Sequence, residues 1–226
     1  MTMRSIRDNA LSLAFGLLFV LALAGQSIAG FFENNERLQE HGLPALGFGA
    51  FLTSSDFVVD VAENWQSEFL QFFLFIAATI WLVQRGSPES KQPGDEGPDS
   101  DEEQLVAEHA RPDSPAWARV RGIRLAIFSN SLLLVMGAVF VLSWLAQSLA
   151  GTVVMNAENA EHDQPAITWA DYLVTPDFWN RTLQNWQSEF LAVGAMIALS
   201  IFLRQRGSSE SKPVGAPHHE TAVSGE

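Results

Sequence analysis

Residues 9–30 read NALSLAFGLLFVLALAGQSIAG, a stretch without one charged side chain. A helix of roughly 20 apolar residues is long enough to cross the hydrocarbon core of a bilayer. Apolar residues occur on every side of such a helix, which favours a membrane span over an amphipathic surface helix. We therefore predict a first span over about residues 10–32.

Three further apolar segments follow at about residues 65–84, 125–151 and 186–204. Together the four segments predict an all-α membrane protein with four transmembrane helices. The first segment has a rival interpretation, because Arg4 and Arg7 before it and Ser27-Ile28-Ala29 near its end also fit a secretory signal peptide.

The sequence repeats itself after a shift of 121 residues, without a gap. Residues 9–30 then lie over residues 130–151, which read NSLLLVMGAVFVLSWLAQSLAG. The heptapeptide NWQSEFL occurs at 64–70 and 185–191, and QRGSPESK at 84–91 lies over QRGSSESK at 205–212. We interpret this as a duplication. The third segment cannot be a cleaved signal, so its N-terminal twin is predicted to be a retained helix.

The repeat predicts how the chain is organised. Residues 1–85 form the first unit and 119–206 the second, and each contains two spans. Both units then enter the membrane from the same side, which makes a parallel tandem repeat of a two-helix unit. Residues 86–118 form an acidic linker and 207–226 a tail. Both are rich in Pro, Gly, Ser and acidic residues, and we predict that both are disordered.

Basic residues predict the orientation, because Lys and Arg gather in cytoplasmic loops. Only Arg37 and Arg181 fall in the two loops opposite the termini. The basic residues on the side of the termini and linker are Arg4, Arg7, Arg85, Lys91, Arg111, Arg119, Arg121, Arg124, Arg204, Arg206 and Lys212. We therefore predict a multi-pass protein of the bacterial inner (plasma) membrane with cytoplasmic N- and C-termini.

Polar residues in the spans define a candidate site. If Arg7 and Arg85 mark the cytoplasmic boundary, roughly 20 helical residues reach Ser27 in the first span and Trp65 in the second. The polar residues at that depth in both units are Gln26, Ser27, Gln66, Ser67, Glu68, Gln147, Ser148, Gln187, Ser188 and Glu189. Two alternatives stay open for this layer. Its side chains join the helices by hydrogen bonds, or Glu68 and Glu189 accept a proton or cation.

Other chemistry has weaker support. Glu40, His41, Glu161 and His162 in the outer loops are candidate metal ligands, although adjacent loop residues rarely converge on one ion. The absence of cysteine excludes thiolate chemistry and iron–sulfur clusters, and the net charge of −13 argues against nucleic-acid binding. We predict no cofactor. No nucleophile elbow, phosphate loop or HExxH motif occurs, which argues against an enzyme without excluding one.

The NWQSEFL and QRGSxESK blocks resemble those of a family of bacterial integral membrane proteins known only as a domain of unknown function. The resemblance runs from about Asn9 to Lys212. It implies an inner-membrane location and supplies no activity or site residue. Our leading hypothesis is passage or sensing of a small ion, proton or solute at the polar layer. A non-catalytic membrane scaffold or envelope-stress accessory protein is the alternative. The lipid bilayer is the expected partner, and a homo-oligomer stays open.

Overall fold

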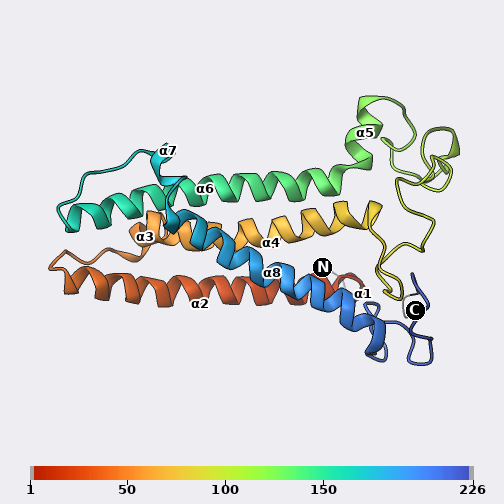
Figure 1. Cartoon of the computed structure of the whole chain (residues 1–226), viewed down its shortest axis with the longest axis horizontal. Helices are drawn as coiled ribbons and strands as arrows, with labels where there is room; N and C mark the ends of the chain where they lie inside the picture. Colours follow the sequence, from red (N-terminus) through yellow and green to blue (C-terminus); the bar gives the residue numbers. More distant parts are fainter. Residues whose placement is uncertain (1–2, 224–226) are drawn as a thin grey trace. The chain divides into compact units, whose positions relative to one another are not determined.

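The computed structural model describes residues 3–223, with side chains from residue 6 onward, and these residues form helices without any strand. The prediction of an all-α chain is confirmed. Figure 1 shows the helices, which are α1 (Met3–Asp8), α2 (Ala10–Glu40), α3 (Phe48–Phe51), α4 (Ser55–Trp81), α5 (Ile123–Ser129), α6 (Ser131–Glu161), α7 (Trp169–Tyr172) and α8 (Pro176–Phe202). A short 3₁₀ helix, η1, covers Ala107–His109 in the linker.

The four predicted segments lie in helices whose ends differ from the predicted bounds. Helix α4 begins about ten residues earlier than predicted because Ser54 caps it, the Ser54 hydroxyl accepting a 3.3 Å bond from Phe57 N. Thr175 caps α8 in the same way, accepting from Phe178 N at 3.2 Å. The third segment is broken at Asn130, between α5 and α6. The bounds of α2, α3 and α4 recur, shifted by 121 residues, as those of α6, α7 and α8.

Two of the long helices, α2 and α6, are long and apolar enough to cross a membrane. Only 6% of the most apolar stretch of α2 is buried, and 17% of that of α6. A core helix of a soluble protein would bury most of such a stretch. The sequence predicts four membrane-spanning helices, whereas two of the described helices have the length and apolar composition of a span. Helices α4 and α8 differ because their N-terminal halves carry the polar NWQSEFL blocks.

The described chain divides into two compact units, and each is treated by itself below. Unit 1 holds the residues up to Val61 together with Ala146–Tyr172, and unit 2 holds Ala62–Leu145 and the residues from Leu173 onward. This division cuts through α4 and α6. The predicted organisation into residues 1–85, 86–118, 119–206 and 207–226 follows the sequence repeat and stays a prediction.

In unit 1 an asparagine fastens each outer loop to the helix before it. The Asn35 side chain donates to Leu46 O at 3.1 Å and accepts from Leu46 N at 2.7 Å. Asn156 does the same with Ile167, at 3.0 and 2.8 Å. Each side-chain amide therefore satisfies both backbone groups of one loop residue, as a neighbouring strand would.

Unit 2 is built around α8, which contacts both α6 and α4. The Trp144 indole from α6 stacks on Phe178 of α8 with ring centroids 5.9 Å apart, and its Nε1 donates to Thr182 Oγ1 at 3.4 Å. On α4, Phe73 lies directly against Gly137 of α6, where a larger residue would collide with the ring. Aromatic packing and a close helix approach therefore hold this unit together.

The QRGSPESK block at 84–91 and the QRGSSESK block at 205–212 fold into loops that directly follow α4 and α8. We call them the first and second capping loops. Ser90 Oγ accepts from Gln84 N at 2.8 Å, and Ser211 Oγ accepts from Gln205 N at 2.9 Å. Gly86 has a φ of +89°, which favours glycine. The matching bonds of Ser90 and Ser211 close a short loop directly after each helix, which gives the blocks a structural role.

The tail folds back onto the first of these loops. Lys212 is 1% exposed, and its ammonium donates to the carbonyls of Gly86 at 2.7 Å, His218 at 3.0 Å and Glu220 at 3.1 Å. Gly86 N in turn donates to Thr221 Oγ1 at 2.9 Å. The disorder of the linker and tail stays a prediction.

Two matched glycine substitutions test the docking of the tail. Gly86 and Gly207 have similar φ values, +89° and +84°, so alanine at either costs similar backbone strain, roughly 1–2 kcal/mol. Only at Gly86 would the new Cβ lie 2.5 Å from His218 O. We expect Gly86→Ala to speed cleavage after Glu220 by a glutamate-specific endoprotease at least about fivefold more than Gly207→Ala, because opening of the docked tail governs cleavage. Equal rates in the two variants, measured by mass spectrometry, would show that the tail is not docked there.

Candidate functional site

The contact between α4 and α8 in unit 2 contains part of the predicted polar layer. Trp186 Nε1 of α8 donates to Gln66 Oε1 of α4 at 2.7 Å. Gln66 is 0% exposed, and its buried Nε2 has no hydrogen-bond partner among the described residues. A buried amide nitrogen left without a partner costs about 1–3 kcal/mol, so this N–H group is suited to donate to a water molecule or a bound solute.

The same two helices carry two carboxylates. Glu68 on α4 is exposed and Glu189 on α8 is half-buried. The two side chains are close enough for their charges to interact. Two like charges held near each other favour the uptake of a proton or a cation, because either one removes their repulsion. The structure therefore brings Glu68 and Glu189 near each other, while Gln66, two residues before Glu68 on α4, lies on a different side of that helix.

The other unit 2 members of the layer do not join the helices. Ser67 and Ser188 donate to carbonyls of their own helices, Asn64 O at 2.9 Å and Asn185 O at 2.8 Å. Gln187, the repeat twin of Gln66, is exposed. Twin residues therefore have different surroundings, which identical sequence blocks cannot reveal.

The remaining four members lie in unit 1. Gln26 is exposed, and Ser27 is buried with its hydroxyl donating to Leu23 O at 2.7 Å. Gln147 is 0% exposed, and neither of its side-chain polar atoms has a partner in the described residues. Ser148 is buried and accepts a 3.0 Å bond from the Trp169 indole of α7. This last bond fixes α7 onto α6.

Sequence analysis missed the role of Arg181. Its guanidinium contacts Glu63 of α4 at 3.4 Å and Asp177 of its own helix at 3.3 Å. Partial burial opposes the charge of Arg181, but the two carboxylates outweigh burial and hold its pKa above the ordinary value. The sequence could have indicated this role, because Arg181 is the one basic residue between positions 152 and 184, where several carboxylates occur. In unit 1, Arg37 pairs with Asp56, and this hydrogen bond raises the Arg37 pKa.

The candidate metal ligands of the outer loops do not form a cluster. His41 Nε2 lies 3.9 Å from Glu161 Oε2, but His41 Nδ1 faces Arg37 O at 2.8 Å. His162 Nδ1 likewise faces Glu158 O at 2.8 Å. Among residues 6–223, whose side chains are described, no three His, Asp or Glu side chains group closely enough to hold a metal ion.

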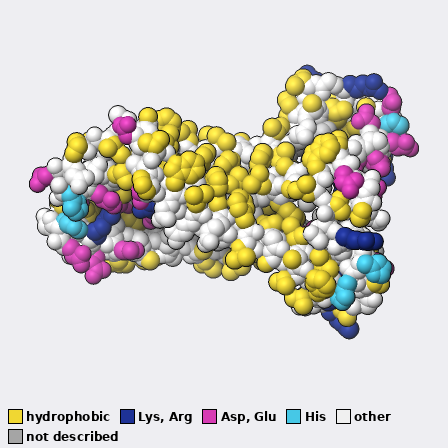
Figure 2. Space-filling view, in the orientation of Figure 1, with side chains coloured by type: hydrophobic (Ala, Val, Ile, Leu, Met, Phe, Trp, Pro, Cys, Tyr) yellow, Lys and Arg dark blue, Asp and Glu magenta, His cyan; other side chains and the backbone are white. Residues whose placement is uncertain are grey.

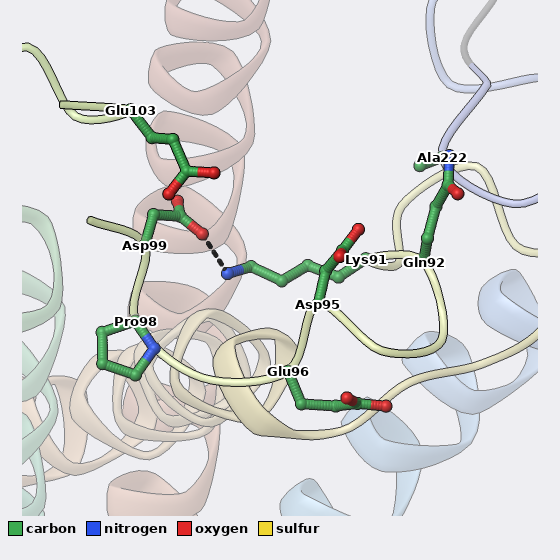
Figure 3. A pocket seen from close by; sticks show the side chains of 8 residues that line it. All are labelled: Lys91, Gln92, Asp95, Glu96, Pro98, Asp99, Glu103 and Ala222. Atoms are coloured by element: carbon green, nitrogen blue, oxygen red, sulfur yellow. Dashed lines mark hydrogen bonds and ion pairs between the residues drawn. The ribbon is translucent and has the colours of Figure 1, made fainter.

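An acidic hollow of about 440 Å³ lies in the linker beside the first capping loop. Figure 3 shows Lys91 extending to Asp99, with Glu103 and Glu96 nearby, and the Lys91–Asp99 distance is 2.5 Å. The hydrogen bond from Lys91 lowers the pKa of Asp99, and a bond from Gln104 adds to this effect. Bonds from Ser100 lower the pKa of Glu103. These carboxylates are therefore ionised at neutral pH.

These features define a helical protein with two helices that could cross a membrane and a polar contact between two other helices. The chain matches the family described as Domain of unknown function (DUF6766) over residues 2–223, and it belongs to that family. No curated protein and no solved structure shows significant similarity to it. The family membership supplies no activity, so function must be argued from the site.

A double-mutant cycle tests the Gln66–Trp186 contact. We expect Gln66→Leu and Trp186→Phe each to lower the free energy of unfolding. The double variant should lose about 1 kcal/mol less than the sum, because either change alone breaks the shared hydrogen bond. The matched pair Gln187→Leu with Trp186→Phe should be additive, since Gln187 is exposed. Chemical unfolding of the purified protein measures both cycles, and additivity in the first would exclude the hydrogen bond.

Proposed function

We propose that the chain is a four-span protein of the bacterial inner membrane, with its termini and linker in the cytoplasm. The uncovered apolar surfaces of α2 and α6 support an environment of lipid hydrocarbon, because water penalises such surfaces by about 25 cal/mol per Å². Figure 2 shows apolar side chains over the helices and charged side chains gathered at the linker and tail of unit 2. The C-terminal halves of α4 and α8 are uncharged, and Arg85 and Arg204 follow them.

The matching bounds of the helices support a parallel tandem repeat. Helices α2 and α6 are 31 residues each, and α4 and α8 are 27 residues each. The loop bonds of Asn35 recur at Asn156, and the capping bond of Ser90 recurs at Ser211. Two units that each contain an even number of spans enter the membrane from one side.

Cysteine labelling distinguishes four spans from two. The chain has no cysteine, so single cysteines at Ser100 in the linker and Asp163 in the second outer loop report unambiguously. With four spans, a membrane-impermeant maleimide should label Asp163→Cys in intact spheroplasts and Ser100→Cys only after lysis. With α2 and α6 as the only spans, both results would be reversed. Ala45→Cys in the first loop should label from outside in either case and serves as the control.

Within this arrangement, the contact of α4 and α8 passes or senses a proton or a small cation. Two observations on α4 and α8 support this proposal: the charges of Glu68 and Glu189 interact, and the buried Nε2 of Gln66 has no hydrogen-bond partner among the residues that the structure describes. Ionisable residues within membrane spans are costly and mark ion or proton pathways. The Gln66 amide supplies a donor for the water that would accompany the ion.

Proteoliposomes with an internal pH-sensitive dye test this proposal. Under an imposed potassium diffusion potential, the wild-type protein should acidify or alkalinise the lumen faster than empty liposomes. Glu68→Gln with Glu189→Gln should reduce this rate at least about tenfold, because neither amide accepts a proton. The control is Glu40→Gln with Glu161→Gln, a second pair of repeat twins outside the polar contact, which should keep the wild-type rate.

Sensing predicts a different signal from passage. Without flux, a change of charge at Glu189 should still shift the emission of Trp186, since Trp186 lies one helical turn before Glu189 on α8. The shift should disappear in the Glu68→Gln, Glu189→Gln variant. Wild-type protein that shows neither flux nor this shift, or a double variant that retains both, would exclude the polar contact as an ion site.

The second candidate function is a non-catalytic membrane scaffold. It is favoured by the acidic hollow of the linker, where Asp95, Glu96, Asp99 and Glu103 surround one lysine. Ionised carboxylates on a cytoplasmic segment would attract a basic protein partner. In this case crosslinking from membranes should return one reproducible partner that Asp95→Asn with Glu103→Gln abolishes, while flux through the helices is absent.

A further inference from the structure

A second hollow, of about 610 Å³, lies in unit 2 where α4 ends and the linker begins. Its size lies within the range of small-molecule sites. Phe75 and Trp81 of α4, Leu82 directly after it and Ile197 of α8 form its apolar wall, and Glu89 and Glu96 are among its polar lining residues. The hollow thus combines an apolar wall with acidic lining residues.

The linker holds the apolar wall in place. Gly97 N donates to Ile80 O at 2.7 Å, which joins the linker to the last turn of α4. Gly97 lies against the Trp81 indole, where an added Cβ would be 3.4 Å from the ring. The capping loop fixes the polar side, because Ser90 accepts from Gln84 N and Ser87 O accepts from Ala222 N of the docked tail at 3.1 Å. The hollow is therefore built from segments that are tied to one another.

Its charge is negative and unbalanced. None of the described residues that line it is basic. Lys91, the nearest lysine in sequence, is engaged by Gly97 O at 2.7 Å and by Asp99. Hydrogen bonds from its own backbone N–H and from Gly94 lower the pKa of Glu96, while burial and the neighbouring Glu210 raise that of Glu89. At neutral pH Glu96 is ionised, and a bound cation would favour the ionised form of Glu89.

We propose that this hollow binds an amphipathic organic ammonium ion. Its apolar group would lie against Phe75, Trp81 and Leu82, and its charged nitrogen would face Glu89 and Glu96. Aromatic rings attract cations through their electron-rich faces, and carboxylates complete the charge match. Simple anions and neutral polar solutes have neither the positive charge nor the apolar group that the hollow complements. The proposal does not depend on Glu68 or Glu189.

Benzyltrimethylammonium, titrated into the full chain in dodecyl maltoside micelles, which contain no ammonium group, tests the site by calorimetry and tryptophan fluorescence. We expect saturable binding at one site, which neutral benzyl alcohol does not reproduce. The fluorescence change should be lost in Trp81→Phe and kept in Trp117→Phe, whose indole lies in the linker outside the hollow. No saturable heat at millimolar concentrations would exclude the site.

A matched charge control separates the site from general attraction to an acidic chain. Glu89→Gln with Glu96→Gln should weaken binding about tenfold, as expected for two lost ion contacts. Asp101→Asn with Glu102→Gln removes the same charge from linker residues that do not line the hollow, and should leave affinity unchanged. Equal weakening by both pairs would overturn the proposal. So would loss of binding in nanodiscs containing phosphatidylethanolamine, because the lipid headgroup would then be the occupant.

Discussion

The apolar surface of α2 constrains the rest of the chain. Leu11 is 75% exposed and Phe15 is 67% exposed, and their neighbours on the helix are similar. Hydrocarbon can cover such a surface without penalty, but in hydrocarbon every backbone N–H and C=O must bond within the protein. Regular helices meet this requirement along their length and fail at their ends. Several polar side chains accordingly bond to backbone groups in loops or at helix ends, as Ser54, Asn35 and Ser90 do.

The two capping loops share one closing hydrogen bond but differ in the partners of their lysines. Both blocks use a serine hydroxyl to accept a backbone N–H after the helix. Their lysines then bind different partners. Lys91 bonds to Gly97 O and Asp99 in the linker, whereas Lys212 is enclosed by carbonyls that include Gly86 O. A lysine ammonium group fits both loops because its three N–H groups can donate to backbone carbonyls or to carboxylates.

Sequence patterns predicted the long helices because uninterrupted apolar runs of about 20 residues are typical of helices that span a membrane. The apolar runs alone place the starts of α4 and α8 too late, since Ser54 and Thr175 cap these helices and extend them into polar sequence. Those starts are recognised instead from the Ser-Ser-Asp-Phe and Thr-Pro-Asp-Phe capping patterns. The same polar sequence makes α4 and α8 less apolar along their length than α2 and α6. The bonds of Arg181 to Glu63 and of Trp186 to Gln66 join residues more than a hundred positions apart, and no local pattern specifies such partners.

The different surroundings of repeat twins bear on where an ion site can lie. Gln66 is buried and Gln187 exposed, and Glu68 is exposed where Glu189 is half-buried. A site on a symmetry axis would give twin residues equal surroundings. Trp186 of α8 donates a hydrogen bond to the Gln66 side-chain oxygen, and the same indole packs against Trp144 of α6. Gln66 and Gln187 therefore have different surroundings. The proposed ion site therefore belongs to the contact of α4 with α8, and the two glutamates need not be equivalent in it. Glu189, being less exposed, carries the larger cost of charge and is the residue whose protonation should govern the site.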